Sequence, residues 1–199
     1  MMHQSVEYAQ YKAQRIKELI PELNRQGVTI LDIGCADGTM TFYLQELFFE
    51  SKVVGVDQDL EKLAQAQKKF PAITFQTTDT VLKKSWDAII IADVLHHVPC
   101  KERANVVQQF MSLVKPGGFC IVLEINPWHY ASRHEFYNNP EEKNAQMLSP
   151  FQAWRLVRRY GSFSFYSFSL PWPLHGVETF LCKVPLGSLY VFRIKKGAD

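Results

Sequence analysis

The sequence lacks both a long apolar run and a block of basic residues. No stretch could span a bilayer, and the polar N-terminus has no apolar signal core behind positive charges. The 22 Lys and Arg and the 20 Asp and Glu are mixed along the chain, which gives a formal net charge of +2. A basic surface that binds the phosphate backbone of a nucleic acid is therefore not expected. We predict a cytoplasmic protein with no membrane span and no nucleic acid partner.

Cysteine is scarce, and its spacing argues against a metal site or a disulfide framework. Cys35, Cys100, Cys120 and Cys182 lie far apart, and no pair has the C-x-x-C spacing of a zinc site. The six histidines form no H-E-x-x-H pattern. We therefore expect no metal site, and we expect buried thiols in place of disulfides.

The length and composition are those of one folded domain. A chain of 199 residues can bury a core unaided, and 47% hydrophobic with 21% charged residues is close to the globular average. We predict a single domain, 1–199, that begins with an amphipathic helix in 1–25 and has its core in 27–125. An irregular segment, 126–160, and closing strands, 161–199, follow. Nothing in the sequence indicates an oligomeric state.

Strand-like and helix-like segments alternate through the core. Strands are expected over Val28–Ile33, Lys52–Val56, Ile73–Thr77, Trp86–Ala92 and Phe119–Ile125, and helices over Thr39–Phe49, Leu60–Phe70 and Lys101–Val114. The short link Asp79–Ser85 has room for only a turn of helix or an open loop. This alternation predicts a parallel sheet with helices on both faces.

The last third of the sequence is less regular. Asn126–Pro150 has poor periodicity, whereas Pro150–Tyr160 has a helical pattern. Ser162–Ser169 and Ser188–Ile194, separated by Pro171, Trp172, Pro173 and Gly176, are predicted to pair as an antiparallel hairpin at the sheet edge. The expected fold is an α/β, doubly wound, Rossmann-like three-layer sandwich whose sheet is mostly parallel and has seven strands.

The segment Leu31–Thr39, L-D-I-G-C-A-D-G-T, ends the first strand and opens a helix. Gly34 permits a sharp turn, and Gly38 is predicted to let a ligand approach the helix N-terminus closely. Asp57 ends the second strand 23 residues after Gly34, where a carboxylate can accept both ribose hydroxyls. Asp59 is close enough to be a rival. The combination predicts a nucleotide site.

A dinucleotide G-x-G-x-x-G pattern would need glycine at positions 34, 36 and 39, where the chain has Gly34, Ala36 and Thr39. The segment instead resembles the first motif of the class I S-adenosylmethionine-dependent methyltransferases, [LV]-[DE]-[ILV]-G-C-G-x-G, and the resemblance covers residues 27–125. Ala36 departs from that motif. The resemblance implies S-adenosylmethionine as cofactor and S-adenosylhomocysteine as product.

The same resemblance implies the cofactor-binding residues. Asp32 would orient the methionine end, and Asp79 would accept from the adenine amino group. The full set is Asp32, Gly34, Cys35, Ala36, Gly38, Asp57, Gln58, Asp79, Thr80 and Ala92.

Two later segments also resemble this family. Ala92–Val98, A-D-V-L-H-H-V, matches the end of strand four, and Val114–Gly118, V-K-P-G-G, matches the turn before strand five. The L-H-H-V run is similar to small-molecule methyltransferases such as those of quinone biosynthesis, which implies a small-molecule methyl acceptor. His96 and Asp93 are candidate bases, whereas His97 is expected to pack; His129 and His134 are further candidate bases.

Acceptor contacts are expected beyond strand five. The candidate residues are Trp128, Tyr130, Arg133, His134, Phe136 and Tyr137. Glu124–Pro127 is similar to an E-x-N-P stretch of methyltransferases that modify saccharide- or lipid-like metabolites, so such an acceptor is one option. Two alternatives remain open: a catalytically silent homologue that binds S-adenosylmethionine and acts through a protein partner, and a nicotinamide-dependent oxidoreductase.

Overall fold

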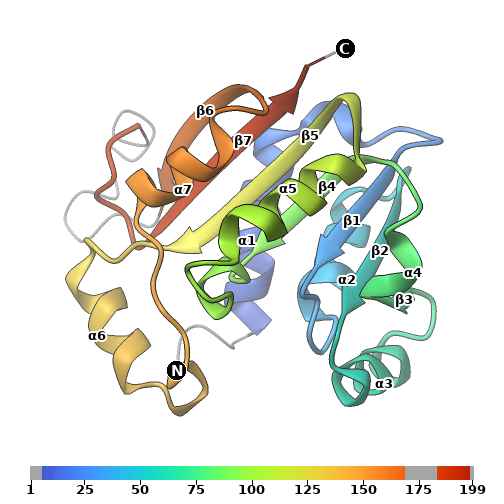
Figure 1. Ribbon diagram of the computed structural model, residues 1–199. Coiled ribbons are helices and arrows are strands. Elements are labelled where there is room, and N and C mark those ends of the chain that lie inside the picture. The colour runs from blue at the N-terminus through green and yellow to red at the C-terminus, as the bar shows by residue number, and fades with distance from the viewer. Residues whose placement is uncertain (1–5, 169–182, 198–199) are drawn as a thin grey trace. The chain divides into compact units, whose positions relative to one another are not determined.

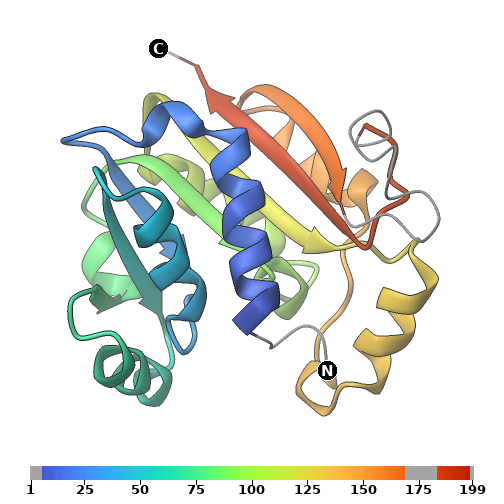
Figure 2. The ribbon, with the colours of Figure 1, turned by 180° about the vertical axis from the view of Figure 1, so that it is seen from behind.

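The computed structural model describes residues 6–168 and 183–197 (Figures 1 and 2). Its contacts divide the chain into two units, Met1–Ile90 with Ser112–Phe119, and Ile91–Met111 with Cys120–Asp199. The strands follow the order β3-β2-β1-β4-β5-β7-β6 in a seven-stranded sheet. This confirms the predicted α/β fold with a mostly parallel sheet, while the assignment of the whole chain to one domain stays a prediction.

The first unit contains the three leading strands. β1 (Thr29–Ile33), β2 (Lys52–Asp57) and β3 (Thr74–Thr77) pair in parallel. The last four residues of β1 and the four middle residues of β2 are all buried, without the alternation of a half-exposed strand. A strand that is buried on both faces needs cover on both faces, and this is why the runs are mostly apolar, with Asp32 as the charged exception.

Four helices and one 3-10 turn belong to this unit. They are α1 (Val6–Leu19), η1 (Pro21–Leu23), α2 (Thr39–Leu47), α3 (Leu60–Lys69) and α4 (Thr78–Val81). α1 buries Ala13 and Ile16 and packs against α2, as Figure 2 shows. α4 is a single turn, so the short link before strand four is the helical alternative of the two that the sequence left open.

The side chain of Asp87 connects three strands of the first unit through hydrogen bonds and an ion pair. It lies in β4 (Trp86–Ala92) and accepts hydrogen bonds from the backbone nitrogen and the hydroxyl of Thr29, both at 2.9 Å. Lys115 forms an ion pair with it at 2.7 Å. Lys115 lies in β5 (Val114–Ile125), which begins earlier than the sequence predicted. The V-K-P-G-G run is therefore part of the strand, with Gly117 at φ +73°.

The second unit holds the remaining elements. They are η2 (Leu95–His97), most of α5 (Arg103–Leu113), α6 (Tyr130–Asn138), η3 (Pro140–Glu142), α7 (Pro150–Val157), β6 (Gly161–Phe168) and β7 (Leu189–Lys196). The expectation of irregular structure over residues 126–150 is wrong where α6 forms. His129 begins α6 by accepting from the Ser132 nitrogen at 3.2 Å, a capping role for which Ser, Thr, Asp and Asn are the usual residues.

The closing hairpin is confirmed. β6 and β7 pair antiparallel from Gly161 opposite Lys196 to Phe168 opposite Leu189, with β6 at the edge (Figure 1). α7 packs against β7, and the buried Tyr190 donates from its hydroxyl to the Leu148 carbonyl at 2.7 Å.

Several sequence predictions concern residues outside the described ranges, namely Ser169, Pro171, Trp172, Pro173, Gly176 and Cys182. Cys35 and Cys120 are buried free thiols as predicted, whereas Cys100 is exposed. In the part of the chain that the structure describes, no helix combines the length and the apolar character needed to cross a membrane.

Candidate functional site

The loop between β1 and α2 is held against the end of β2 by backbone hydrogen bonds. The nitrogens of Gly34 and Cys35 both donate to the Val56 carbonyl, at 2.8 and 3.0 Å. Gly34 and Gly38 have φ values of +72° and +76°, in the left-handed region that glycine enters without strain. The sequence thus correctly predicted a sharp turn at Gly34.

The reason predicted for Gly38 is different in the structure. Gly38 is buried, and a Cβ placed there would lie 2.5 and 2.8 Å from two ring atoms of Phe75 and 3.0 Å from the Ala66 Cβ. The missing side chain therefore makes room for the aromatic ring of β3. Packing within the protein thus accounts for glycine at this position, and a close approach of a ligand to it stays a prediction.

Ala36, the departure from the family motif, also adopts the left-handed region, with φ +47°. A non-glycine residue costs about 1–2 kcal/mol in this region. The Ala36 nitrogen donates to the Asp57 Oδ2 at 2.9 Å. The chain therefore keeps a loop conformation that suits glycine, and this hydrogen bond helps to hold it.

Asp57 and Asp59, the two rival carboxylates, have separate roles. Asp59 is the N-cap of α3 and accepts from the nitrogens of Glu61 and Lys62 at 3.0 and 3.1 Å. Asp57 is half-buried at the end of β2 and accepts from Ala36 and, through Oδ1, from the Asp59 nitrogen at 3.0 Å. Each of its oxygens retains a further lone pair. Asp57 is thus the carboxylate that contacts the loop.

Asp32 is a fully buried carboxylate at the end of β1. Thr41 donates its hydroxyl to the Oδ2 atom at 2.6 Å, whereas Oδ1 has no hydrogen-bond partner among the described residues. Burial raises the pKa of Asp32 to about 7, against the opposing effects of Thr41 and Lys12. An unsatisfied buried carboxylate oxygen fits a cationic amino group, such as that of the methionine end of S-adenosylmethionine.

The other predicted cofactor residues differ in exposure. Gln58, Asp79 and Thr80 are exposed, Gly34 lies at the surface of the loop, and Cys35 is buried. The Thr80 hydroxyl donates to the Thr77 carbonyl at 2.7 Å, which holds the single turn of α4. Ala92, the buried last residue of β4, belongs to the second unit. Their contact with a cofactor stays a prediction.

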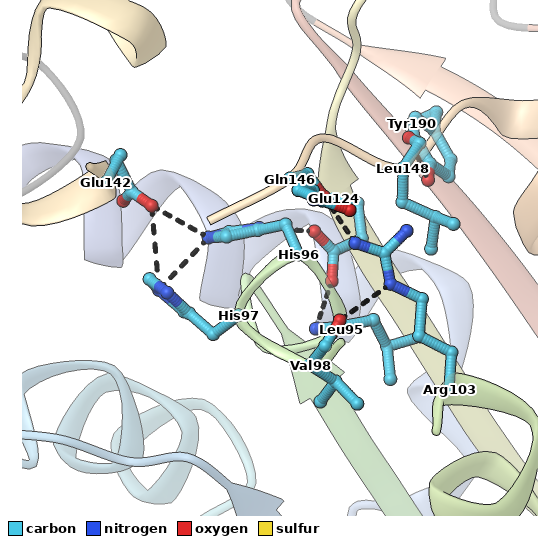
Figure 3. A network of polar contacts seen from close by, with 10 residues as sticks. All are labelled: Leu95, His96, His97, Val98, Arg103, Glu124, Glu142, Gln146, Leu148 and Tyr190. Atoms are coloured by element: carbon cyan, nitrogen blue, oxygen red, sulfur yellow. Dashed lines mark hydrogen bonds and ion pairs between the residues drawn. The ribbon is translucent and has the colours of Figure 1, made fainter. Parts of the chain in front are cut away.

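The second unit contains a buried polar network centred on Glu124 (Figure 3). Glu124, near the end of β5, is 1% exposed and accepts from the Leu95 nitrogen at 2.7 Å. Its other oxygen lies 2.6 Å from the His96 Nδ1. The His96 Nε2 lies 3.1 Å from the His97 Nε2, and both nitrogens point toward Glu142. Asp93, the other candidate base, is half-buried with φ +56°.

The paired histidines differ in exposure in the opposite sense to their predicted roles. His96 is 2% exposed and packs edge-on against the Phe136 ring, whereas the His97 side chain is 51% exposed. Burial alone would lower the pKa of His96, but Glu124 outweighs it and raises the pKa to about 10. Burial and the neighbouring His96 lower the pKa of His97. A raised pKa makes His96 a poorer base, and its assignment as a catalytic residue stays a prediction.

Arg103 stabilises the loop that carries the histidines. Its guanidinium is 2% exposed and donates to the Val98 carbonyl at 2.9 Å and to the Gln146 carbonyl. The Gln146 nitrogen donates in turn to the His96 carbonyl at 2.8 Å. Two segments that are far apart in sequence are thereby fixed side by side (Figure 3).

The predicted acceptor residues fall on two sides of α6. Tyr130, Arg133, His134 and Tyr137 are exposed and share one face, since they repeat at three- and four-residue spacing. Phe136 is 1% exposed on the opposite side. Its assignment as an acceptor contact is wrong, because Phe136 lies on the buried side of α6. Sequence reasoning did not detect the helical period that places it there.

Trp128 and Tyr130 line a hollow of about 560 Å³ together with His129, Ala131, Pro185 and Leu186. Asn126, at the end of β5, is fully buried and donates through Nδ2 to the carbonyls of Pro185 and Gly187, at 3.0 and 2.8 Å. Within the E-x-N-P stretch, Asn126 therefore supports the chain beside this hollow.

Sequence reasoning missed Glu124 as a partner of His96, and it missed Glu142 and Arg103 entirely. Glu142 is 45 residues from His97, in a stretch without clear periodicity, so no spacing rule could connect them. The one available signal was a glutamate inside the apolar run of β5, because a charged residue is rarely buried unless it is paired.

A family model described as a methyltransferase domain matches residues 5–175. The chain is 25% identical over 122 residues to trans-aconitate 2-methyltransferase of Azoarcus sp., covering 58% of this chain and 46% of that protein. It is 27% identical over 115 residues to phosphoethanolamine N-methyltransferase 1 of Arabidopsis thaliana, covering 53% of this chain and 23% of that protein. The chain thus spans less than half the length of these relatives.

The fold is also similar to solved structures. A SAM-dependent methyltransferase from Archaeoglobus fulgidus superposes with a TM-score of 0.72 at 17% identity, covering 94% of each chain. This likeness supports the architecture alone. The family match names a methyltransferase domain, so the oxidoreductase alternative is not retained.

Proposed function

The chain belongs to the class I S-adenosylmethionine-dependent methyltransferase family, and from that premise we propose that it transfers a methyl group from S-adenosylmethionine to a small-molecule acceptor. The observation that carries the proposal is the buried Asp32 carboxylate with an unsatisfied oxygen, in a β1–α2 loop that Asp57 holds in place. Both features lie in the segment that resembles the first motif of the family.

Binding would depend on residues of the first unit. Asp32 would receive the amino group of the cofactor, and Asp57 would accept from the ribose hydroxyls. S-adenosylmethionine supplies an electrophilic methyl carbon on a sulfonium. Displacement at that carbon disperses charge, so the protein must chiefly hold two reactants in line, and this requires positioning more than acid–base chemistry.

The proposed acceptor face is the exposed side of α6, with Tyr130, Arg133, His134 and Tyr137. The relatives support a small acceptor, since their names specify trans-aconitate and phosphoethanolamine. Arg133 gives this face a cation that can pair with a carboxylate or a phosphate. If the acceptor must lose a proton, Asp93 is the proposed base, because Glu124 raises the pKa of His96 and makes it a poorer base.

The first experiment measures S-adenosylhomocysteine binding by calorimetry in two variants. Asp57→Ala removes charge-assisted hydrogen bonds worth about 1.5–3 kcal/mol each, so the affinity should fall roughly tenfold or more. Asp59→Ser removes a carboxylate two residues away but keeps an N-cap side chain, and should leave the affinity unchanged. Equal dissociation constants in wild type and a folded Asp57→Ala variant would contradict the ribose assignment.

The second experiment measures turnover with a panel of small carboxylates, phosphates and saccharides. Methylation of any of them supports the proposal, while a folded chain that binds no S-adenosylhomocysteine refutes it. The silent homologue is the second candidate, favoured by Ala36 in its left-handed conformation. Tight cofactor binding without turnover on the panel would favour that candidate.

A further inference from the structure

Three side chains of the second unit bring their ligand atoms together in a small triangle. The Nε2 atoms of His96 and His97 lie 3.1 Å apart, and the Glu142 Oε2 lies 3.4 Å from the first and 3.7 Å from the second. Figure 3 shows all three side chains directed to a common point. The three residues come from η2 and η3.

The Glu142 oxygen lies within ion-pair distance of two imidazole nitrogens. It is buried and has no hydrogen-bond partner among the described residues, although it faces two imidazole nitrogens. Its separations from them exceed the usual length of an N–H···O bond, about 2.7–3.2 Å. An ion pair with His96 accounts for one of these contacts. A carboxylate oxygen and two imidazole nitrogens that face one point also form the arrangement found around a bound metal ion.

The dimensions of the triangle fit a first-row metal ion. A point equidistant from atoms with these three separations lies about 2.0 Å from each. Zinc binds histidine nitrogen and carboxylate oxygen at about 2.0–2.2 Å. Calcium and magnesium prefer sets of oxygen ligands, so two imidazoles and one carboxylate favour zinc or a similar transition metal.

The surroundings of His96 add an independent feature of metal sites. A ligating histidine usually gives its second ring nitrogen to a carboxylate, which fixes the ring orientation and the tautomer. The His96 Nδ1 lies 2.6 Å from the buried Glu124, so Nε2 is the nitrogen directed at Glu142 and His97.

The backbone around the three side chains is also fixed. The Gln146 nitrogen donates to the His96 carbonyl at 2.8 Å, and the Glu142 nitrogen donates to the Asn139 carbonyl at 3.0 Å. Arg103 holds the carbonyls on either side of the cluster. The ligand atoms therefore sit on two braced turns, as a preorganised site requires.

We propose that His96, His97 and Glu142 form a binding site for one zinc ion, with Glu124 as the positioning partner of His96. Three protein ligands leave one tetrahedral position for water or for an oxygen of a bound molecule. The half-exposed His97 gives solvent access to the site. Metal binding is independent of the proposed methyl transfer, and the sequence missed the site because Glu142 is distant in sequence.

The test uses the full chain, treated with a chelator, freed of it and titrated with Zn²⁺ by calorimetry at pH 8. Wild type should bind one equivalent with a dissociation constant at or below the micromolar range. His97→Ala and Glu142→Gln each remove one ligand and should weaken binding at least tenfold. Glu124→Gln should weaken it about 10–100-fold, as the loss of an outer-shell partner does. His134→Ala, at an exposed histidine of α6, is the matched control and should bind as wild type does.

Co²⁺ gives a second readout, because its visible absorption reports tetrahedral coordination. Circular dichroism of each variant checks folding, and His97→Ala replaces a half-exposed residue that a folded chain can lose. Absence of saturable Zn²⁺ binding by wild type would overturn the proposal. So would equal binding by wild type, His97→Ala and Glu142→Gln. No assay uses turnover, so failure here is distinct from failure of the proposed function.

Discussion

Replacement of the buried Asp32 by asparagine should change how the free energy of unfolding depends on pH. Burial raises the pKa of Asp32 to about 7, from its ordinary value of 3.8. Between these two values the folded chain holds a proton that the unfolded chain releases. The folded state then binds more protons, so the stability of wild type decreases as the pH rises. The side chain of asparagine cannot ionise, so the Asp32→Asn variant lacks this contribution.

The expected magnitude follows from the two pKa values. Each pKa unit corresponds to about 1.4 kcal/mol, so the full penalty for ionising Asp32 approaches about 4 kcal/mol. Of this total, about 2.5 kcal/mol of the free energy of unfolding of wild type should be lost between pH 5 and pH 8. Asparagine retains an oxygen that can accept from the Thr41 hydroxyl, so the variant should fold. The free energy of unfolding of Asp32→Asn, relative to that of wild type, should therefore rise by this amount from pH 5 to pH 8.

The assay is urea denaturation of both proteins at pH 5, 6, 7 and 8 without cofactor. Asp37→Asn is the matched control. Burial alone would raise the pKa of Asp37, but hydrogen bonds from Lys69 and Thr39 outweigh it and lower the pKa. Asp37 is therefore ionised in both states throughout this range, and its replacement should leave the pH profile parallel to that of wild type. Parallel profiles for wild type and Asp32→Asn would refute the reasoning.

Two further predictions concern packing and the acceptor. Gly38→Ala should lower the free energy of unfolding by about 2–4 kcal/mol, because it adds a clash with the Phe75 ring to the strain of a positive φ. Gly27→Ala, with φ +83° and nothing within 4 Å, carries only the strain and should cost about 1–2 kcal/mol in urea denaturation; equal losses would exclude the clash. Alanine at both Tyr130 and Tyr137 should reduce turnover strongly while calorimetry finds S-adenosylhomocysteine affinity nearly unchanged, whereas equal losses would place these residues against the cofactor.

The elements of the cofactor half could be predicted from the sequence because their signals are local. β1 and β2 are mostly apolar, and α3 has acidic and basic ends with Asp59 as its cap. Strand four was predicted with its observed limits, Trp86–Ala92. Asp57 could be chosen as a candidate from the sequence because it ends a predicted strand. The ends of adjacent parallel strands meet at one edge of a sheet.

The α6 region was beyond sequence reasoning for a physical reason. Only Ser132 and Phe136 are buried in this helix, so its apolar stripe is too narrow to give a clear helical period. Without that period, Phe136 could not be distinguished from the exposed Tyr137 beside it. The hydrophobic contact that turns Phe136 inward, its edge-on packing against His96, joins residues 40 positions apart.

What the sequence by itself determined is the order of strands and helices as far as β5, the nucleotide-type loop and the family, since each depends on neighbouring residues and their period. Only the tertiary structure decided the pKa values and the contacts of the buried polar side chains. The pKa of Asp32 depends on complete burial, and that of His96 on Glu124, which is 28 residues away. Likewise, His96, His97 and Glu142 converge from two loops that are distant in sequence and that Arg103 and Gln146 join through hydrogen bonds. Electrostatic interaction depends on distance and burial in space, and separation along the chain encodes neither.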